Sequence, residues 1–310
     1  MTVTSAEQSS LLSAPVVVTG SRGRLASHLA GALRAAGIEV VKVSRDAGED
    51  RISYDELESS GLLDRASALV HCAWSSLPAT AEENPGSTKA HDLPLLHRLL
   101  DATAKRESDK PLHFVFLSTG GAVYGECAEP ADEDAPLEPV GWYGRGKVEA
   151  EKLLAARADQ SATALCILRP SNPYGFRHAA DKPQGIVGAA LHAAQTGEPL
   201  KLVGGGASLK DFLHIADFES AVIHCLNRRL TGVYNICSGQ SVRTLDIIEL
   251  LEETGGIKVP RVDVPAVPWD VHACLLSRDK FTAATGWTPE RDLRRGLREA
   301  LRDAGFNVPG

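Results

Sequence analysis

The sequence predicts a doubly wound α/β fold with a mostly parallel sheet. Five short runs of apolar and β-branched residues recur along the first half of the chain, each bounded by helix- or turn-forming segments. They are Val16–Val18, Val40–Val43, Leu69–Cys72, Phe114–Leu117 and Leu165–Leu168. Runs that are apolar throughout, without alternation, are typical of parallel strands covered on both faces.

Segments with helical spacing separate these runs. Leucines at 25, 29 and 33 follow an i, i+4, i+8 pattern, and Gly37 ends that helix. A second helix is indicated by the leucines between Leu93 and Leu100, and a third begins near Tyr143. Strands that alternate with helices in this way predict helices on both faces of one sheet.

The chain changes character after Pro170, where glycine and proline become frequent. One more strand is expected at Gly232–Ile236, followed by a helix near Leu245–Leu251 and a last helix that ends near Leu301. We expect a first domain over 11–170, to which about 211–236 returns. The remaining segments, about 171–210 and 237–310, form a smaller α/β C-terminal lobe.

Charge and cysteine content exclude several classes of partner. The 33 Lys and Arg against 40 Asp and Glu give a net charge of −7, which argues against nucleic acid and anionic membranes as partners. No apolar run approaches the ~20 residues of a membrane span, and Met1–Ala14 is a polar tail without signal-peptide features. Six scattered cysteines without a Cys-x-x-Cys spacing predict free thiols, no metal site and a cytoplasmic protein.

A glycine-rich turn follows the first predicted strand. Thr19–Ala26 has the spacing Gly-x-x-Gly-x-x-Ala and opens the first helix. Glycines at 20 and 23 allow a tight turn and let backbone N–H groups approach a pyrophosphate at the helix N-terminus. Two glycines alone would also fit an ordinary turn, but their place between strand and helix predicts a dinucleotide site.

The end of the second strand bears on which dinucleotide binds. A site selective for NAD normally has an acid there, whereas this strand ends in Ser44 and Arg45. With Arg22, Arg45 could hold a 2′-phosphate, because a guanidinium matches phosphate oxygens. We therefore favour NADP(H), while solvated arginines together with Asp46 would leave NAD possible.

Tyr143 and Lys147 form a Tyr-x-x-x-Lys pair at the start of the third helix. Residues four apart lie on one helix face, so the ammonium is expected to lower the tyrosine pKa towards working pH. Such a tyrosine suits proton exchange with a sugar or alcohol oxygen during hydride transfer. Ser118 and Thr119, after the fourth strand, supply hydroxyls that could hold the same oxygen.

Together these segments resemble the extended short-chain dehydrogenase/reductase family, the NAD-dependent epimerase/dehydratase group. The resemblance covers about 15–305 and rests on these motifs: Thr19–Ala26, Leu69–Trp74, Ser118–Gly125, Tyr143–Lys147, Leu168–Gly175, Asp211–Asp217, Tyr234–Ile236 and Gly286–Pro289. It implies a Rossmann-type fold with a substrate lobe, and a cytoplasmic enzyme that acts on a nucleotide-linked sugar. It also implies a homodimer formed through the second and third helices.

The resemblance assigns roles to individual residues. Tyr143 would be the acid/base and Lys147 would hold the nicotinamide ribose, with Thr119 as the hydroxyl and Ser118 in reserve. The expected cofactor contacts are Gly20, Arg22, Gly23, Arg24, Leu25, Ser44, Arg45, Ala73, Lys147 and Pro170. The expected substrate contacts are Asn172, Lys210 and His272.

Several positions depart from the family pattern. Gly121 and Ala122 stand where 4,6-dehydratases have an Asp-Glu pair, which disfavours that reaction. Lys210 replaces a usual arginine, and Ala273 stands where a diphosphate-binding arginine is common, with His272 beside it. Asp92 occupies a position where relatives usually have asparagine.

Two enzyme reactions remain. In a ketoreductase, NADPH reduces a keto carbon, C4 of a nucleotide-linked deoxysugar being the first choice, and Tyr143 protonates the oxygen. In a 4-epimerase of a UDP- or dTDP-hexose, Tyr143 removes the C4 hydroxyl proton and bound NAD takes the hydride. Arg45 favours the reductase, whereas the segments Ser118–Gly121 and Asn172–Gly175 favour the epimerase. A non-catalytic NADP(H) sensor is a third hypothesis, opposed by the intact Tyr143 and Lys147.

Overall fold

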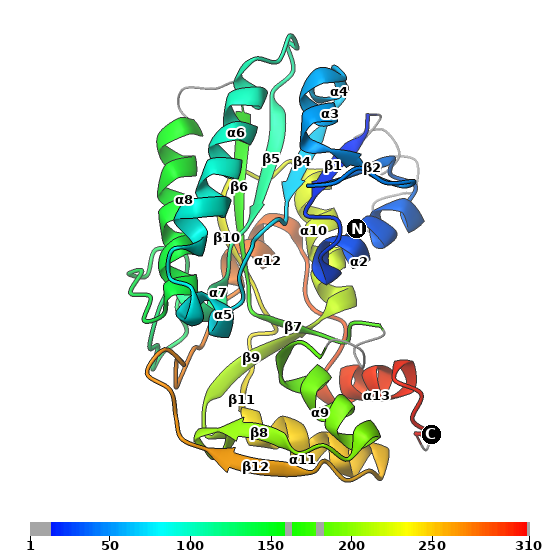
Figure 1. Cartoon of the computed structure of the whole chain (residues 1–310), viewed down its shortest axis with the longest axis vertical. Coiled ribbons are helices and arrows are strands. Elements are labelled where there is room, and N and C mark those ends of the chain that lie inside the picture. Colours follow the sequence, from blue (N-terminus) through cyan, green and yellow to red (C-terminus); the bar gives the residue numbers. More distant parts are fainter. Residues whose placement is uncertain (1–13, 159–162, 178–182, 309–310) are drawn as a thin grey trace. The chain divides into compact units, whose positions relative to one another are not determined.

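The computed structural model describes residues 14–158, 163–177 and 183–308 (Figure 1). The polar tail expected at Met1–Ala14 lies almost wholly outside the described residues. Two compact units divide the chain. The first comprises the described residues of Met1–Ser118, Trp142–Arg169 and Glu219–Tyr234, and the second those of Thr119–Gly141, Pro170–Phe218 and Asn235–Gly310.

The first unit is built on a seven-stranded sheet in the order β10-β6-β5-β4-β1-β2-β3. Its strands are β1 (Val16–Thr19), β2 (Val40–Ser44), β3 (Ile52–Ser53), β4 (Ala68–His71), β5 (Leu112–Leu117), β6 (Thr163–Pro170) and β10 (Gly232–Ile236). The pairings of β1 with β2 and β4, and of β5 with β4 and β6, are all parallel. This confirms the predicted fold class, and all six strands expected from the sequence are present.

Helices cover both faces of this sheet (Figure 1). They are α2 (Arg24–Ala35), α3 (Tyr54–Ser59), α4 (Leu62–Arg65), α5 (Pro78–Glu83), α6 (Leu93–Ala104), α8 (Trp142–Ala158) and α10 (Ile215–Arg228). Leu96 of α6 and Leu154 of α8 pack with Phe114 and Phe116 of β5 in one apolar core. On the opposite face, α2 and α10 are linked by His28 and Glu219, whose side chains lie 3.6 Å apart.

A five-residue π-helical turn, Thr88–Asp92, leads directly into α6. Such turns add one residue to a helical turn and so rotate the side chains that follow; they are frequent at functional sites. Asp92, the last residue of the turn, is 5% exposed. The turn therefore places a buried carboxylate at the start of α6, which the leucine spacing did not predict.

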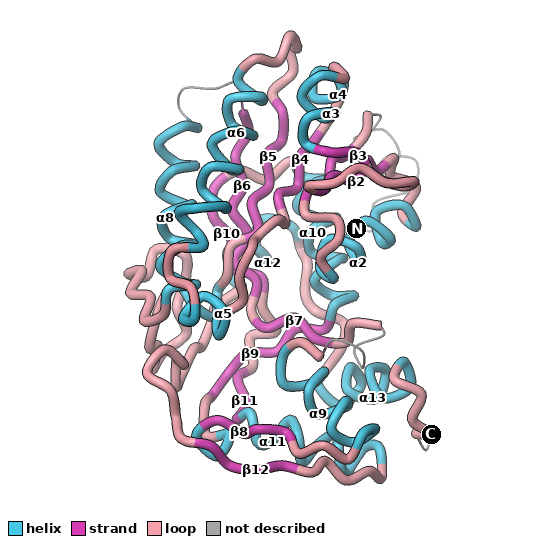
Figure 2. Tube along the Cα trace, in the orientation of Figure 1, coloured by secondary structure: helices cyan, strands magenta, loops and turns pink. Residues whose placement is uncertain are grey.

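The second unit contains two small sheets (Figure 2). It also has a separate apolar core. Its strands are β7 (Asn172–Tyr174), β8 (Leu200–Val203), β9 (Leu209–His214), β11 (Ser241–Arg243) and β12 (Arg261–Val264). Its helices are α7 (Gly120–Val123), α9 (Gly185–Thr196), the 3₁₀ turn Gly204–Gly206, α11 (Thr244–Gly255), α12 (Asp279–Thr285) and α13 (Leu293–Asp303). The core lies between α9, α11 and α13.

Buried acids anchor loops within the second unit. The Asp211 carboxylate accepts bonds from the N–H groups of Ser238, Gly239 and Gln240. Asp217 receives the backbone N–H of Arg291 and forms an ion pair with its guanidinium at 3.1 Å. The Asp211–Asp217 motif thus has a structural function in this unit.

The compact units group Thr119–Gly141 with the second unit, whereas the sequence-based boundaries keep it with the first. The sequence-based boundaries of the two domains remain a prediction. In the part of the chain that the structure describes, no helix is both long enough and apolar enough to span a membrane.

Candidate functional site

The glycine-rich turn between β1 and α2 presents backbone donors at a helix N-terminus. Gly20 has a φ of +70°, and a Cβ there would lie 2.6 Å from the backbone N of Ala73, so only glycine fits. The N-cap of α2 is Gly23, which has no side chain to accept hydrogen bonds from the first turn of the helix. The first N–H groups of α2 therefore remain available to an anion, as the sequence predicts.

A cavity of about 550 Å³ lies in front of this turn. Six of the expected cofactor contacts line it: Gly20, Arg22, Gly23, Ser44, Arg45 and Ala73. Three other expected cofactor contacts of the first unit, Arg24, Leu25 and Lys147, are outside the lining. The lining also includes functional side chains that were not among the predicted contacts: Tyr54, Asp55, Cys72, Trp74, Ser75, His91, Asp92 and Arg98.

The cavity fits a dinucleotide by its size, its donors and its unpaired polar atoms. Among the described residues, the indole N–H of Trp74, a lining residue, is buried without a hydrogen-bond partner, and so is the hydroxyl of Ser21, which belongs to the glycine-rich turn but not to the lining. Because burying an unpaired polar atom is costly, these atoms indicate contacts to a bound molecule. The helix N-terminus supplies donors for a pyrophosphate at the same place.

Positive groups gather where β2 ends. Arg45 and Ser44 line the cavity there. The carboxylate of Asp46 accepts a bond from Arg22 Nη1 at 3.1 Å, on the exposed surface. The acid that could have selected NAD is thus already engaged by a guanidinium.

Lys147 of α8 is 3% exposed and is not itself a lining residue, but it contacts Trp74, which is one. Its Nζ donates to the backbone oxygen of Leu117 at 2.8 Å and lies 3.9 Å from the centre of the Trp74 ring. The ring of Phe116 is 4.8 Å away. Burial lowers the pKa of this lysine to about 7.

The structure corrects the expected effect of Lys147 on Tyr143. The sequence spacing predicts a lowered tyrosine pKa, but burial and the nearby Asp92 carboxylate raise the pKa of Tyr143 to about 12. The ammonium lies 5.9 Å from the centre of the Tyr143 ring and is directed towards Leu117 and Trp74. In this form of the protein, Tyr143 is therefore a neutral proton donor.

Ser118 belongs to a buried ionic network. Its hydroxyl donates to Glu151 Oε1, and the same carboxylate receives Arg169 Nε at 3.1 Å and Nη2 at 2.6 Å. Glu151 and Arg169 are 5% and 4% exposed. Since the Ser118 hydrogen is already bonded, Thr119, the N-cap of α7 in the second unit, remains the first choice for the reactive hydroxyl.

The predicted substrate residues belong to the second unit, as does Pro170. Asn172 Nδ2 donates to the backbone oxygen of Asp211 at 2.8 Å. Lys210 Nζ is paired with Asp270 at 2.8 Å and also donates to Val271 O at 2.5 Å. The side chain of His272 is exposed. Their roles towards a substrate stay predictions, and Lys210 would have to leave Asp270 to bind phosphate.

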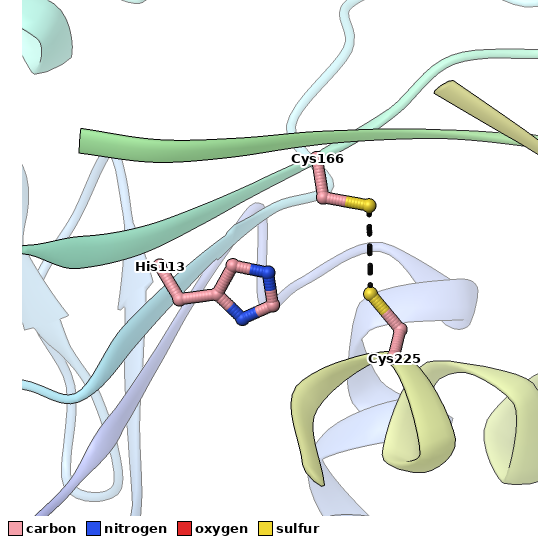
Figure 3. Close-up of side chains that lie close together, drawn as sticks. All are labelled: His113, Cys166 and Cys225. Atoms are coloured by element: carbon pink, nitrogen blue, oxygen red, sulfur yellow. Dashed lines mark hydrogen bonds between the residues drawn. The ribbon is translucent and has the colours of Figure 1, made fainter. Parts of the chain in front are cut away.

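One cluster that the sequence spacing did not indicate joins β5, β6 and α10 (Figure 3). One ligand atom from each of His113, Cys166 and Cys225 lies within 4.8 Å of the others, and all three residues are buried. The Cys225 thiol donates to Cys166 Sγ at 3.5 Å, and His113 Nε2 is 2.7 Å from Leu230 O. Burial lowers the pKa of His113 to about 4, and the hydrogen bond with Cys166 together with burial raises the pKa of the Cys225 thiol. A neutral imidazole and a neutral Cys225 thiol thus lie in this part of the core.

The comparison with known families decides the identity. The sequence model of the NAD dependent epimerase/dehydratase family matches residues 16–237, more than half of the chain. The chain belongs to this family. It is therefore a member of an enzyme family built on a dinucleotide-binding fold, in agreement with the cavity and the glycine-rich turn.

Members with different reactions are similar to this chain. The UDP-glucose 4-epimerase of Azospirillum brasilense is 27% identical over 319 residues, covering 92% of this chain and 90% of that protein. The dTDP-6-deoxy-L-talose 4-dehydrogenase (NAD(P)(+)) of Kitasatospora kifunensis is 27% identical over 312 residues, covering 92% and 94%. The structure of the Thermus thermophilus UDP-glucose 4-epimerase in complex with NAD has a TM-score of 0.83 and 25% identity, covering 95% and 100%.

Proposed function

We propose that this enzyme is an NADP(H)-dependent ketoreductase that reduces C4 of a nucleotide-linked deoxysugar. The observation that carries this proposal is Arg45, which lines the cavity at the end of β2, where a site selective for NAD normally has an acid. Reduction of a ketone creates an alkoxide that needs a proton, so a neutral phenol is the form that this reaction requires. Tyr143, whose pKa burial raises to about 12, is such a phenol.

Arg45 supports NADP(H) as the cofactor. It lines the cavity beside Ser44, where the 2′-position of a bound adenosine ribose is expected after the second strand. Arg22 is 3.1 Å from Asp46 and can exchange that exposed partner for a phosphate at little cost, because exposed ion pairs are weak. Together the two guanidinium groups offer bidentate contacts to a phosphate.

The residues of the first unit have separate tasks in this reaction. Tyr143 donates its proton to the forming alkoxide, while Lys147 would hold the nicotinamide ribose. Trp74 covers one side of the Lys147 ammonium and excludes water from it. When bound, NADPH supplies the hydride.

The proposed substrate contacts come mostly from the second unit. Thr119, or Ser118 of the first unit in its place, is the proposed hydroxyl partner of the substrate oxygen, and Asn172 and His272 are proposed substrate contacts.

A nucleotide-sugar 4-epimerase is the second candidate. It is favoured by the likeness to UDP-glucose 4-epimerases over more than nine tenths of the chain, including one whose structure is in complex with NAD. That reaction also needs a Tyr-x-x-x-Lys pair, but it retains its NAD and consumes no external reductant.

Cofactor consumption separates the two candidates. The purified enzyme is dialysed, its bound nucleotide is identified, and NADPH is then mixed with a dTDP- or UDP-linked 4-keto-6-deoxyhexose. The reductase consumes one NADPH for each ketone and releases NADP. Tightly retained NAD, with C4 epimers forming from a UDP-hexose and no NADPH consumed, would identify the epimerase. Binding of NADP(H) with neither reaction would favour the sensor.

We also propose a cytoplasmic homodimer formed through α6 and α8. These helices pack side by side, and Arg157 of α8 is paired with Asp101 of α6 at 2.6 Å. Light scattering coupled to gel filtration measures the mass in solution, and a monomer at micromolar concentration would contradict the dimer.

A further inference from the structure

Asp92 is a buried carboxylate in the lining of the cofactor cavity. It is the last residue of the π-helical turn, lines the cavity and is 5% exposed. Its Oδ1 accepts the backbone N–H of Ser75 at 2.7 Å, and its Oδ2 accepts the Ser75 hydroxyl at 2.8 Å. Both donors are uncharged, and these bonds fix the carboxylate in position. Burial raises the pKa of Asp92 above its ordinary value, while the bonds from Ser75 and the charge of Lys147 act to lower it.

The π-helical turn is packed tightly against the helix that carries Tyr143 and Lys147. Gly146 of α8 lies against Thr88, and a Cβ at Gly146 would come within 2.6 Å of Thr88 Oγ1. The absence of a side chain at this one position lets the turn approach α8. Asp92 is therefore held by Ser75 on one side and by the contact of the turn with α8 on the other.

The other charged and titratable groups around Lys147 are less suited to balance its charge. Glu151, four residues further along α8, is already engaged by the Arg169 guanidinium through two nitrogens. Burial raises the pKa of Cys72 to about 12, so its thiol is neutral, and burial lowers the pKa of His71 to about 3, so its imidazole is neutral. Tyr143 is a neutral phenol. Asp92 is the remaining carboxylate: it is bonded to Ser75, whose chain neighbour Trp74 lies 3.9 Å from the Lys147 ammonium.

We propose that Asp92 is a positioning residue whose negative charge keeps Lys147 protonated beside the cofactor cavity, so that the charge at position 92 sets the pH range of catalysis. This inference rests on the proposed function of the Tyr143–Lys147 pair. It also gives a physical meaning to the carboxylate at a position where asparagine is usual. An asparagine can make the same bonds to Ser75, but it carries no charge.

The direction of the pKa changes supports this inference. Burial lowers the pKa of Lys147, and among the groups that raise it again Asp92 has the largest effect. The same carboxylate raises the pKa of Tyr143. Loss of the charge at position 92 therefore lowers the pKa of both groups. In a reductase that needs a protonated Lys147, activity declines as the pH rises through the pKa of this lysine. Without the charge at position 92, this decline would begin at a lower pH than in the native protein.

Trp74 provides a readout that needs neither cofactor nor substrate. Its ring lies 3.9 Å from Lys147 Nζ, so the loss of the ammonium charge changes the electric field on the indole and shifts its emission. The difference between the spectra of a protein and its Trp74→Phe variant isolates this signal from the other three tryptophans. The midpoint of the difference signal, measured against pH, reports the protonation of Lys147 in the cofactor-free protein.

The test compares Asp92→Asn with Asp92→Glu, and uses Asp101→Asn as a control for net charge. Asp101 lies on α6 and is paired with Arg157, away from the cavity. We expect the emission midpoint and the alkaline limb of the pH–rate profile to move down by about one pH unit in Asp92→Asn. They should stay within about 0.3 units of the native protein in Asp92→Glu and Asp101→Asn.

Equal midpoints for the native protein and Asp92→Asn would overturn the inference. If Asp92→Asn does not fold, Asp92→Glu decides, because a midpoint displaced as far as one unit would show that shape at position 92 matters more than charge. Failure of the proposed reduction is a separate result, since the native protein would then consume no NADPH while the emission titration remained measurable.

Discussion

The ammonium nitrogen of Lys147 lies 3.9 Å from the centre of the Trp74 indole ring. A cation over an aromatic face in a desolvated place is worth about 2 kcal/mol or more, which offsets part of the cost of burying the lysine. Trp74 lines the cavity, and within the described residues its own N–H is unpaired. One residue thus stabilises the lysine and presents a donor to the molecule that enters the cavity.

Replacement of Arg45 tests the choice of cofactor. Arg45→Asp removes a guanidinium and adds a negative charge where the 2′-phosphate is expected, so NADPH affinity should fall about tenfold or more. NADH has no phosphate there, and its affinity should change by less than about threefold. Both dissociation constants come from fluorescence titration of the purified protein.

The matched control for this variant is Arg65→Asp, which makes the same charge change on the exposed surface of α4. It should leave both affinities unchanged. Equal losses of NADPH and NADH affinity in Arg45→Asp would remove the basis for a 2′-phosphate site.

The Glu151–Arg169 pair should be important for stability. Glu151→Gln keeps the shape of the side chain but leaves a guanidinium that is 4% exposed without its carboxylate. We expect the free energy of unfolding to fall by about 3–5 kcal/mol, measured by urea denaturation. Glu253→Gln breaks the exposed pair with Arg294 and should cost less than about 1 kcal/mol. Similar losses in both variants would be the contrary result.

Gly146 should reverse the usual effect of alanine in a helix. Alanine normally stabilises a helix interior by about 1 kcal/mol relative to glycine. At Gly31 of α2, where an added Cβ meets no atom within 4 Å among the contacts considered, Gly31→Ala should show this gain. At Gly146 the added Cβ would lie 2.6 Å from Thr88 Oγ1, so Gly146→Ala should destabilise by about 1–3 kcal/mol. Thermal unfolding of the two variants checks the opposite signs, and a gain in both would mean that the turn and α8 are not tightly packed.

Because His113 is buried, we expect the free energy of unfolding to decrease on acidification. Burial lowers its pKa from 6.5 to about 4 in the folded protein. The unfolded state therefore holds more protons between these values, and the free energy of unfolding rises with pH across that window. The contribution is about 3 kcal/mol, lost as the pH falls from 6.5 to 4. Urea titrations at several pH values should show a shallower dependence in His113→Gln than in the native protein, and equal slopes would contradict the buried neutral imidazole.

The central sheet could be predicted because its strands carry their own signal. Val16–Val18 and Phe114–Leu117 are buried on both faces, so every position is apolar and the run is visible without knowledge of its neighbours. By contrast, β9 contains Lys210 and Asp211, whose polar groups are satisfied by Asp270 and by the Ser238–Gln240 loop. Those partners are distant in sequence, and this strand was not expected.

Part of the cavity could also be predicted, because some of its residues carry a signal within short segments of the sequence. The glycines at 20 and 23 and the arginines at 22 and 45 lie in two short segments whose spacing is diagnostic. The sequence showed Asp92 only as a departure from the family pattern, since a π-helical turn leaves the leucine spacing of α6 unchanged. The pKa of Tyr143 was predicted in the wrong direction, because spacing reports the nearby ammonium but not the burial of the phenol.

The most direct measurement is the consumption of NADPH by the native enzyme and by Tyr143→Phe, with a nucleotide-linked 4-keto-6-deoxyhexose as substrate. The proposed mechanism predicts one NADPH consumed for each ketone reduced, and a loss of at least about a hundredfold in turnover when the phenol is removed. The affinity for NADPH should be retained in the variant. Unchanged turnover in Tyr143→Phe, or a native enzyme that consumes no NADPH, would contradict it.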